Sequence, residues 1–142
     1  MKFRHIGLVV NDHKKSLKFW TKNFGFKISS NKEEKGHQIS KILGFKETVI
    51  RSIKLVDTTN RLFLELISFK NPKIIKNKIK VNTAGLTHFA LTVKDLDKIY
   101  TKLSKKIKFI SKPILSVDKK VKVVYARVDD TLFIELVEEL KP

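Results

Sequence analysis

The chain has 142 residues, of which 42% are hydrophobic, so it has enough apolar material for one ordinary domain with a buried core and is not a disordered chain. It contains no cysteine, which excludes disulfide frameworks, thiolate metal sites and cysteine nucleophiles. Its 31 lysine and arginine residues against 14 acidic residues give a net charge of +17, which raises the question of nucleic-acid binding.

The basic residues favour a solvated surface over a nucleic-acid site. Only 4 of the 31 are arginines, the residue that makes bidentate contacts to phosphates and bases, and the lysines are spread along the whole chain. Such a surface would still attract a small anionic substrate. No apolar run reaches the roughly 18 residues of a membrane span, and the first residues show no signal-peptide pattern. We therefore expect a cytoplasmic protein that binds neither nucleic acid nor membranes.

The first half of the chain predicts a strand, a helix and three further strands. Its opening residues alternate in hydrophobicity, as in a strand with one buried face. Asp12 is a suitable N-cap for the helix that follows, and Gly25 is a suitable stop. The four strands, of which the last two form a hairpin, are expected at 3–10, 26–30, 49–56 and 62–69. We interpret residues 31–47 as an insertion that contains a short helix at 37–45.

The second half repeats this order after a linker rich in lysine and asparagine. Asp95 is again a suitable N-cap for the expected helix. Pro113 interrupts the second strand, because proline cannot donate to a strand ladder. The strands are expected at 86–93, 107–110, 121–128 and 131–138. The chain is thus expected to be a single domain with module one at 1–70, a linker at 71–83 and module two at 84–142.

An internal repeat supports this division. Residues 5–12 (HIGLVVND) align with residues 88–95 (HFALTVKD), which lie 83 positions later. Residues 61–67 (RLFLELI) align with residues 131–137 (TLFIELV), which lie 70 positions later. The smaller spacing of the second pair indicates extra residues in the first module, in keeping with the insertion.

Four polar residues recur in register within these segments. His5 shares a strand face with Gly7, as His88 shares one with Ala90, so each histidine has space beside it. A carboxylate inside an apolar strand is costly unless it is paired, protonated or bound to metal. Two glutamates nevertheless stand at matching positions of such strands, Glu65 and Glu135. Imidazole nitrogen with carboxylate oxygen suits a divalent transition metal such as Ni, Co, Mn, Fe or Zn.

The alternative interpretation is ordinary strand chemistry. A single histidine on a strand is more often hydrogen-bonded or half-exposed than a metal ligand, and a single glutamate more often lies on the solvated face of an antiparallel sheet. The recurrence of all four residues in repeat register favours metal ligation.

At these residues the chain resembles the vicinal oxygen chelate superfamily, which includes glyoxalase I, methylmalonyl-CoA epimerase, extradiol dioxygenases, fosfomycin resistance enzymes and bleomycin-binding proteins. The resemblance is carried by residues 5–12, the aromatic residues that follow them, the repeat at His88, and residues 133–138. It implies an α+β fold in which two tandem βαβββ modules curve into a partly closed mixed β-barrel cleft.

The resemblance also implies the ligands and the chemistry. One divalent metal ion would lie between the modules, and its ligands would be His5, Glu65, His88 and Glu135. A set of four is similar to bacterial glyoxalase I, whereas methylmalonyl-CoA epimerases usually carry glutamine at the position of Glu65. The implied enzyme is a lyase or isomerase that moves a proton next to a carbonyl through a metal-stabilised enediolate. Glu135 is the first candidate for the general base and Glu65 the second.

Two alternatives remain at this point: an epimerase-like racemase, and a non-catalytic small-molecule binding protein of the same fold. The expected substrate is small and either anionic or carbonyl-containing, and the resemblance implies a homodimer. Further candidates are Glu33 or Glu34 as the base, His37 closing over the cleft, and Arg51 or Arg127 holding a substrate carboxylate or phosphate.

Overall fold

The computed structural model describes residues 1, 3–60, 63–128 and 130–140. Two compact units, Met1–Ile75 and Lys76–Pro142, divide the chain, and each is described by itself. The elements of the first unit are β1 (Ile6–Val9), α1 (His13–Phe24), β2 (Lys27–Lys35), α2 (His37–Leu43), β3 (Val49–Val56) and β4 (Phe63–Asn71). Those of the second are β5 (His88–Thr92), α3 (Leu96–Leu103), β6 (Lys108–Phe109), β7 (Ile114–Leu115), β8 (Val121–Arg127) and β9 (Phe133–Glu139).

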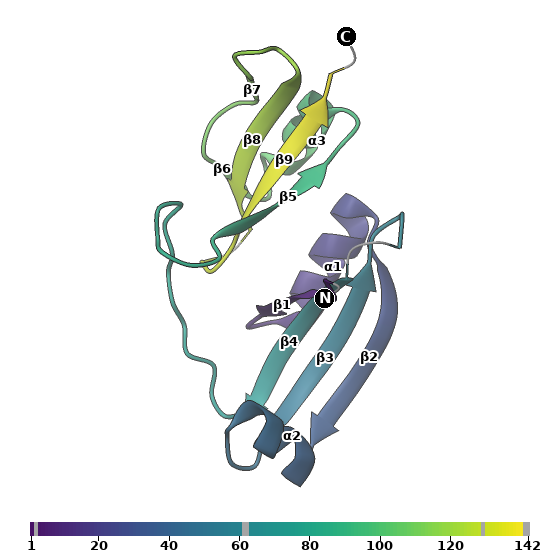
Figure 1. Cartoon of the computed structure of the whole chain (residues 1–142), viewed down its shortest axis with the longest axis vertical. Helices are drawn as coiled ribbons and strands as arrows, with labels where there is room; N and C mark the ends of the chain where they lie inside the picture. Colours follow the sequence, from purple (N-terminus) through teal and green to yellow (C-terminus); the bar gives the residue numbers. More distant parts are fainter. Residues whose placement is uncertain (2, 61–62, 129, 141–142) are drawn as a thin grey trace. The chain divides into compact units, whose positions relative to one another are not determined.

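The first unit is a four-stranded mixed sheet with α1 against one face (Figure 1). The strand order is β1-β4-β3-β2, with β1 parallel to β4 and the other pairs antiparallel. Because side chains alternate along strands, the residues on the α1 side form the core. These are Leu8, Ile53, Leu55, Leu64 and Leu66, each at most 7% exposed. We call the other face of this sheet the open face of unit one.

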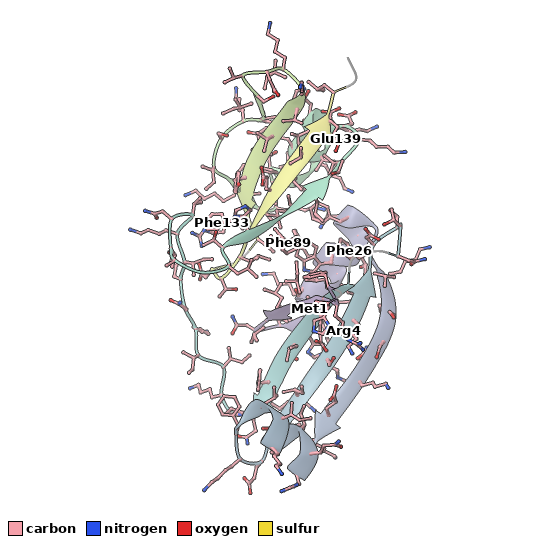
Figure 2. All side chains as sticks on the ribbon, in the orientation of Figure 1. Met1, Arg4, Phe26, Phe89, Phe133 and Glu139 are labelled. Atoms are coloured by element: carbon pink, nitrogen blue, oxygen red, sulfur yellow. The ribbon has the colours of Figure 1, made fainter. Side chains whose placement is uncertain are left out.

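Capping residues set the length of α1. The Asp12 carboxylate accepts a hydrogen bond from the Lys15 backbone N–H at 3.0 Å, and Gly25 ends the helix in the left-handed conformation with φ 72°. Trp20 is fully buried beneath the helix, and its ring lies 5.6 Å from that of Phe26, which Figure 2 labels. Both predicted caps are therefore found, and they place Trp20 over the core.

The second strand is longer than predicted. It was expected at 26–30, but β2 continues to Lys35, so the insertion is confined to the residues after it. Because the sequence after Ser30 is strongly polar, this part of the strand was not predicted. An edge strand tolerates such a sequence because its side chains remain in water. Of the expected insertion, the short helix α2 is present and lies at the end of the sheet where β2 ends and β3 begins (Figure 1).

The second unit repeats the arrangement in shortened form. Its strand order is β5-β9-β8-β6, with β5 parallel to β9, and β7 pairs with β8 beside β6. The predicted second strand is thus split into two short pieces around Pro113. The core between α3 and the sheet includes Leu96 and Leu103 of the helix and Ile134 and Leu136 of β9, each 0% exposed. The face of this sheet away from α3 is the open face of unit two.

Two mixed sheets, each with a helix on one face and formed by a βαβββ-like order, confirm the predicted α+β class. The described strands form no closed barrel. No helix in the described part of the chain is long and apolar enough to cross a membrane. The division into linker and modules within a single domain stays a prediction.

Candidate metal centre

The first unit brings His5 and Glu65 together on its open face. The parallel pairing of β1 with β4 places Gly7 beside Glu65, and His5 lies two residues before Gly7. Its Nε2 is 2.9 Å from Glu65 Oε2, with the two side chains 30% and 13% exposed. The second carboxylate oxygen, Oε1, accepts a hydrogen bond of 2.6 Å from the hydroxyl of Ser52 on β3. Both oxygens of Glu65 are therefore held in fixed directions.

The second unit repeats the pair with a looser geometry. Ala90 stands beside Glu135 in the parallel pairing of β5 with β9, and His88 Nε2 is 3.7 Å from Glu135 Oε2. The other ring nitrogen, Nδ1, lies 3.2 Å from the hydroxyl of Thr87. In the tautomer that carries its proton on Nδ1, the Thr87 hydroxyl is the acceptor and Nε2 has the lone pair that a metal-binding histidine needs.

Tyr125 joins the second pair. Its hydroxyl lies 3.2 Å from His88 Nε2, and the two rings meet edge to face at 5.0 Å. Burial raises the pKa of Tyr125, and the hydrogen bond to Glu135 and the negative charge of Glu135 raise it further. The hydroxyl is therefore protonated at neutral pH and can donate a hydrogen bond within this cluster.

Lys54 occupies the equivalent position in the first unit. The antiparallel register sets Lys54 opposite Glu65, just as it sets Tyr125 opposite Glu135. Directly opposite side chains share a sheet face, with Cβ atoms about 5 Å apart. Lys54 is half-buried, and among the described residues its ammonium group has neither a hydrogen-bond nor an ion-pair partner.

Lys54 and Tyr125 were not among the residues predicted from the sequence. The signal was available in principle, because counting across each predicted hairpin pairs them with the glutamates. The exact register depends on the length of the hairpin turn, which differs between the two halves.

The two candidate arginines are engaged elsewhere. Arg51 is paired with Ser68, which contacts His13 of α1, so it lies on the face opposite Glu65, and its guanidinium donates to Asn31 at 3.1 Å. The guanidinium of Arg127 lies 4.4 Å over the ring of Phe133 and donates to the Ile79 carbonyl at 2.6 Å. The expectation that either holds a substrate anion is therefore not supported.

The alternative base Glu33 also lies on the α1 side of β2. It forms an ion pair of 2.6 Å with Lys70, and this hydrogen bond and charge hold the pKa of the Glu33 carboxyl below its usual range. Glu34 points to the open face, since it pairs with Ile50, but it stands near the end of β2 that adjoins α2. His37 lines a hollow formed by the α2 segment itself.

The two histidine–glutamate pairs fit metal ligation on their own geometry. Two ligand atoms about 2.1 Å from one ion lie roughly 3.0 Å apart at a right angle and roughly 3.4 Å apart at a tetrahedral angle. The observed separations of 2.9 and 3.7 Å are close to this range. No group of three or more histidine, aspartate or glutamate residues that could hold a metal occurs among the described residues. Each unit by itself thus supplies two donors, and the sharing of one ion by all four residues stays a prediction.

Comparison with protein families identifies the scaffold. The model of the glyoxalase/bleomycin resistance protein/dioxygenase superfamily matches residues 2–130. The chain belongs to this superfamily. This glyoxalase-superfamily protein is 30% identical over 105 residues to the uncharacterised protein YwkD of Bacillus subtilis (strain 168), an alignment that covers 72% of the chain and 69% of YwkD. The predicted family is thereby confirmed.

Solved structures of the glyoxalase superfamily share the fold. A glyoxalase family protein from Bacillus cereus superposes with a TM-score of 0.91 at 19% identity, over 99% of this chain and 95% of that one. The fosfomycin resistance protein FosX of Listeria monocytogenes, in complex with Mn(II) and sulfate, superposes with a TM-score of 0.60 at 12% identity, over 98% and 93% of the two chains. These likenesses establish the fold, and the FosX complex shows that this scaffold can carry a divalent metal.

Proposed function

We propose that this protein is a divalent-metal-dependent enzyme that moves a proton at a carbon next to a carbonyl group, with His5, Glu65, His88 and Glu135 as metal ligands. The observation that carries the proposal is the repetition of one arrangement in both units. In each, a histidine approaches a glutamate on the open face of a sheet, beside a glycine or alanine that leaves room. A structural ion pair would not need this free space twice.

A bound divalent cation supplies positive charge that stabilises the negative charge developing beside a carbonyl during proton removal. The chain's own residues would hold the ion and move the proton. Imidazole and carboxylate donors suit Ni, Co, Mn, Fe or Zn, one ion per chain.

Glu135 is the better placed of the two carboxylates to accept the proton. Both oxygens of Glu65 are engaged, one by His5 and one by Ser52. Glu135 lies 3.7 Å from its histidine and is 24% exposed, against 13% for Glu65. A less constrained and more accessible carboxylate can approach a substrate C–H bond, so Glu135 remains the first choice for the general base and Glu65 the second.

Lys54 supports an anionic substrate. The Lys54 ammonium group has no carboxylate partner within the described ranges and lies on the same face as Glu65, so it is suited to a substrate carboxylate or phosphate. The net charge of +17 adds a long-range attraction for the same anions. We propose a small molecule that carries both a carbonyl and an anionic group.

Elemental analysis of chelator-free purified protein tests the proposal. About one equivalent of transition metal per chain is expected, with loss of most of it in Glu135→Gln. The matched control is Glu139→Gln, an exposed carboxylate on the same strand, which should keep the metal. Absence of metal, together with no uptake of added Ni, Co, Mn, Fe or Zn, would overturn the proposal and leave the non-catalytic binding protein.

Proton NMR in D₂O then tests the reaction on the metal-loaded protein. Incorporation of deuterium next to the carbonyl is expected with the hemithioacetal of methylglyoxal and glutathione if the enzyme is glyoxalase-like. It is expected with a methylmalonyl thioester if the enzyme is epimerase-like. Both reactions begin with the same proton removal and differ in where the proton returns. A protein that binds metal but exchanges neither proton would contradict these two assignments.

A further inference from the structure

An apolar hollow of about 260 Å³ lies in the second unit beside the His88–Glu135 pair. Its walls come from the linker, from β7 and the segment before it, and from β8. The principal lining residues are Val81, Ile110, Ile114, Val123 and Tyr125. No charged side chain lines it among the described residues. A concave apolar surface of this kind excludes ionic groups and favours hydrocarbon.

The hollow shares a sheet face and a residue with the candidate metal ligands. Val123 and Tyr125 are two apart on β8, so both point to the open face that carries Glu135, which is opposite Tyr125. Ile114 is paired with Val123, and the Ile110 N–H donates to the Tyr125 carbonyl at 2.9 Å. Tyr125 lines the hollow, and its hydroxyl lies 3.2 Å from His88 Nε2. The polar pair and the apolar hollow are therefore adjacent parts of one surface.

The wall formed by Val81 is anchored by hydrogen bonds. The Ile79 N–H donates to the Asp130 carbonyl at 2.9 Å, and Arg127 donates to the Ile79 carbonyl at 2.6 Å. The next residue, Lys80, begins a tight turn, in which its N–H donates to the Thr83 hydroxyl at 2.8 Å. The Ile79 bonds hold the linker against the rest of unit two just before Val81, and the turn fixes the linker backbone around Val81, so this wall of the hollow is part of the fold.

We propose that this hollow binds the apolar group of the substrate, an uncharged aromatic ring or branched aliphatic chain attached to the carbonyl-bearing carbon handled at His88 and Glu135. The proposal rests on the proposed function for the identity of the neighbouring site. Its volume exceeds the roughly 150 Å³ of an apolar protein cavity that binds benzene. A phenyl-sized group therefore fits, and a methyl group alone leaves most of the hollow unfilled.

Binding of fluorobenzene to the metal-free full-length chain tests the hollow without depending on metal or catalysis. Saturable changes in the ¹⁹F NMR signal of fluorobenzene are expected, with a dissociation constant of millimolar order or below. Val123→Phe should weaken binding at least fivefold by filling the hollow. The control Val117→Phe places the same ring at a fully exposed position of the same unit and should leave binding unchanged.

A second pair of variants tests the same hollow in case Val123→Phe does not fold. Ile114 is 58% exposed, so Ile114→Asp puts a charge at the rim without disturbing the core, and it should also abolish binding. Val117→Asp is its matched control. The proposal would be overturned if fluorobenzene showed no saturable binding to the wild-type protein, or if the control variants lost binding as much as Val123→Phe and Ile114→Asp.

Two further measurements test whether fluorobenzene binds beside His88 and whether the hollow instead binds a second copy of the chain. Fluorobenzene should shift the side-chain NMR signals of His88 and leave those of His13, which contacts Ser68 in the first unit, unchanged. Binding without a shift at His88 would overturn the assignment of the hollow to the substrate site. Light scattering that shows a dimer in the wild type and a monomer in Ile114→Asp, with no fluorobenzene binding to either, would assign the hollow to self-association instead.

Discussion

Lys54 lies directly opposite Glu65 in the antiparallel pairing of β3 with β4, and the corresponding position opposite Glu135 is occupied by Tyr125. The repeat therefore preserves its histidine–glutamate pairs while placing a cation beside one and a phenol hydroxyl beside the other. This difference leads to the first prediction.

Lys54→Met should weaken the binding of an anionic substrate. Hydrogen bonds to charged groups contribute about 1.5–3 kcal/mol, so KM should rise roughly 10- to 100-fold while metal content stays at the wild-type level. Lys18→Met, on the exposed face of α1, is the matched control and should change KM little. Steady-state kinetics with metal analysis measures both. Loss of metal in Lys54→Met would mean that the lysine acts on Glu65 rather than on substrate.

Ser52→Ala should reduce metal affinity. The Ser52 hydroxyl orients the Glu65 carboxylate through a 2.6 Å hydrogen bond, and loss of a group that orients a metal ligand typically costs 10- to 100-fold in affinity. Ser68→Ala removes a hydroxyl from β4 that contacts His13 on the α1 side instead. Competition with a metal-binding dye should show the loss only in Ser52→Ala, and equal affinities in the two variants would contradict the orienting role.

Position 7 should accept alanine in place of Gly7 but not a large side chain. A Cβ atom at Gly7 would meet Ile67 Cδ1 at 3.9 Å, an ordinary contact, so Gly7→Ala should fold and bind metal normally. Gly7→Leu would extend into the space beside Glu65 and should lower metal uptake while leaving the thermal midpoint within a few degrees of the wild type. Circular dichroism and metal titration check the two effects. Undiminished uptake in Gly7→Leu would show that the space beside Glu65 is not needed.

The N-cap of α1 should make stability depend on acidic pH. The hydrogen bond from the Lys15 backbone N–H lowers the pKa of the Asp12 carboxyl below its ordinary value of 3.8. The carboxylate therefore contributes stability above that value, and the contribution is lost as pH falls through the folded-state pKa. Asp12→Asn keeps a capping oxygen that does not titrate. Urea midpoints of the two proteins should differ most near neutral pH and converge as the pH falls through the folded-state pKa of Asp12, and parallel curves would contradict the assignment.

The sequence predicted those features that depend on local chemistry or on repetition. Asp12 and Gly25 bound α1 because capping is a local preference, and β3 was predicted over its observed range because its apolar residues recur with strand periodicity. The two histidine–glutamate pairs followed from the repeat. The coarse fold and the family were thus accessible before any coordinates were considered.

The features that escaped prediction depend on tertiary register. The continuation of β2 to Lys35 is invisible in composition, because a charged edge strand has the same residues as a solvated loop. Lys54 and Tyr125 become site residues only when hairpin register is known, since a shift of one residue would turn each to the other face. The hollow beside Tyr125 is assembled from the linker, the segment before β7, β7 and β8, which no local pattern connects.

The position of α2 separates the insertion from the histidine–glutamate pair of the first unit. The insertion joins the sheet where β3 begins, at Val49, which pairs with Asn71 at the far end of β4 from Glu65. Six residues of strand, roughly 20 Å, separate Asn71 from Glu65. Mutation or lengthening of the α2 segment can therefore proceed without displacing the histidine–glutamate pair of the first unit. Strand pairing holds the histidine–glutamate pair at one end of this sheet, and the α2 segment lies at the other, so the two can change independently.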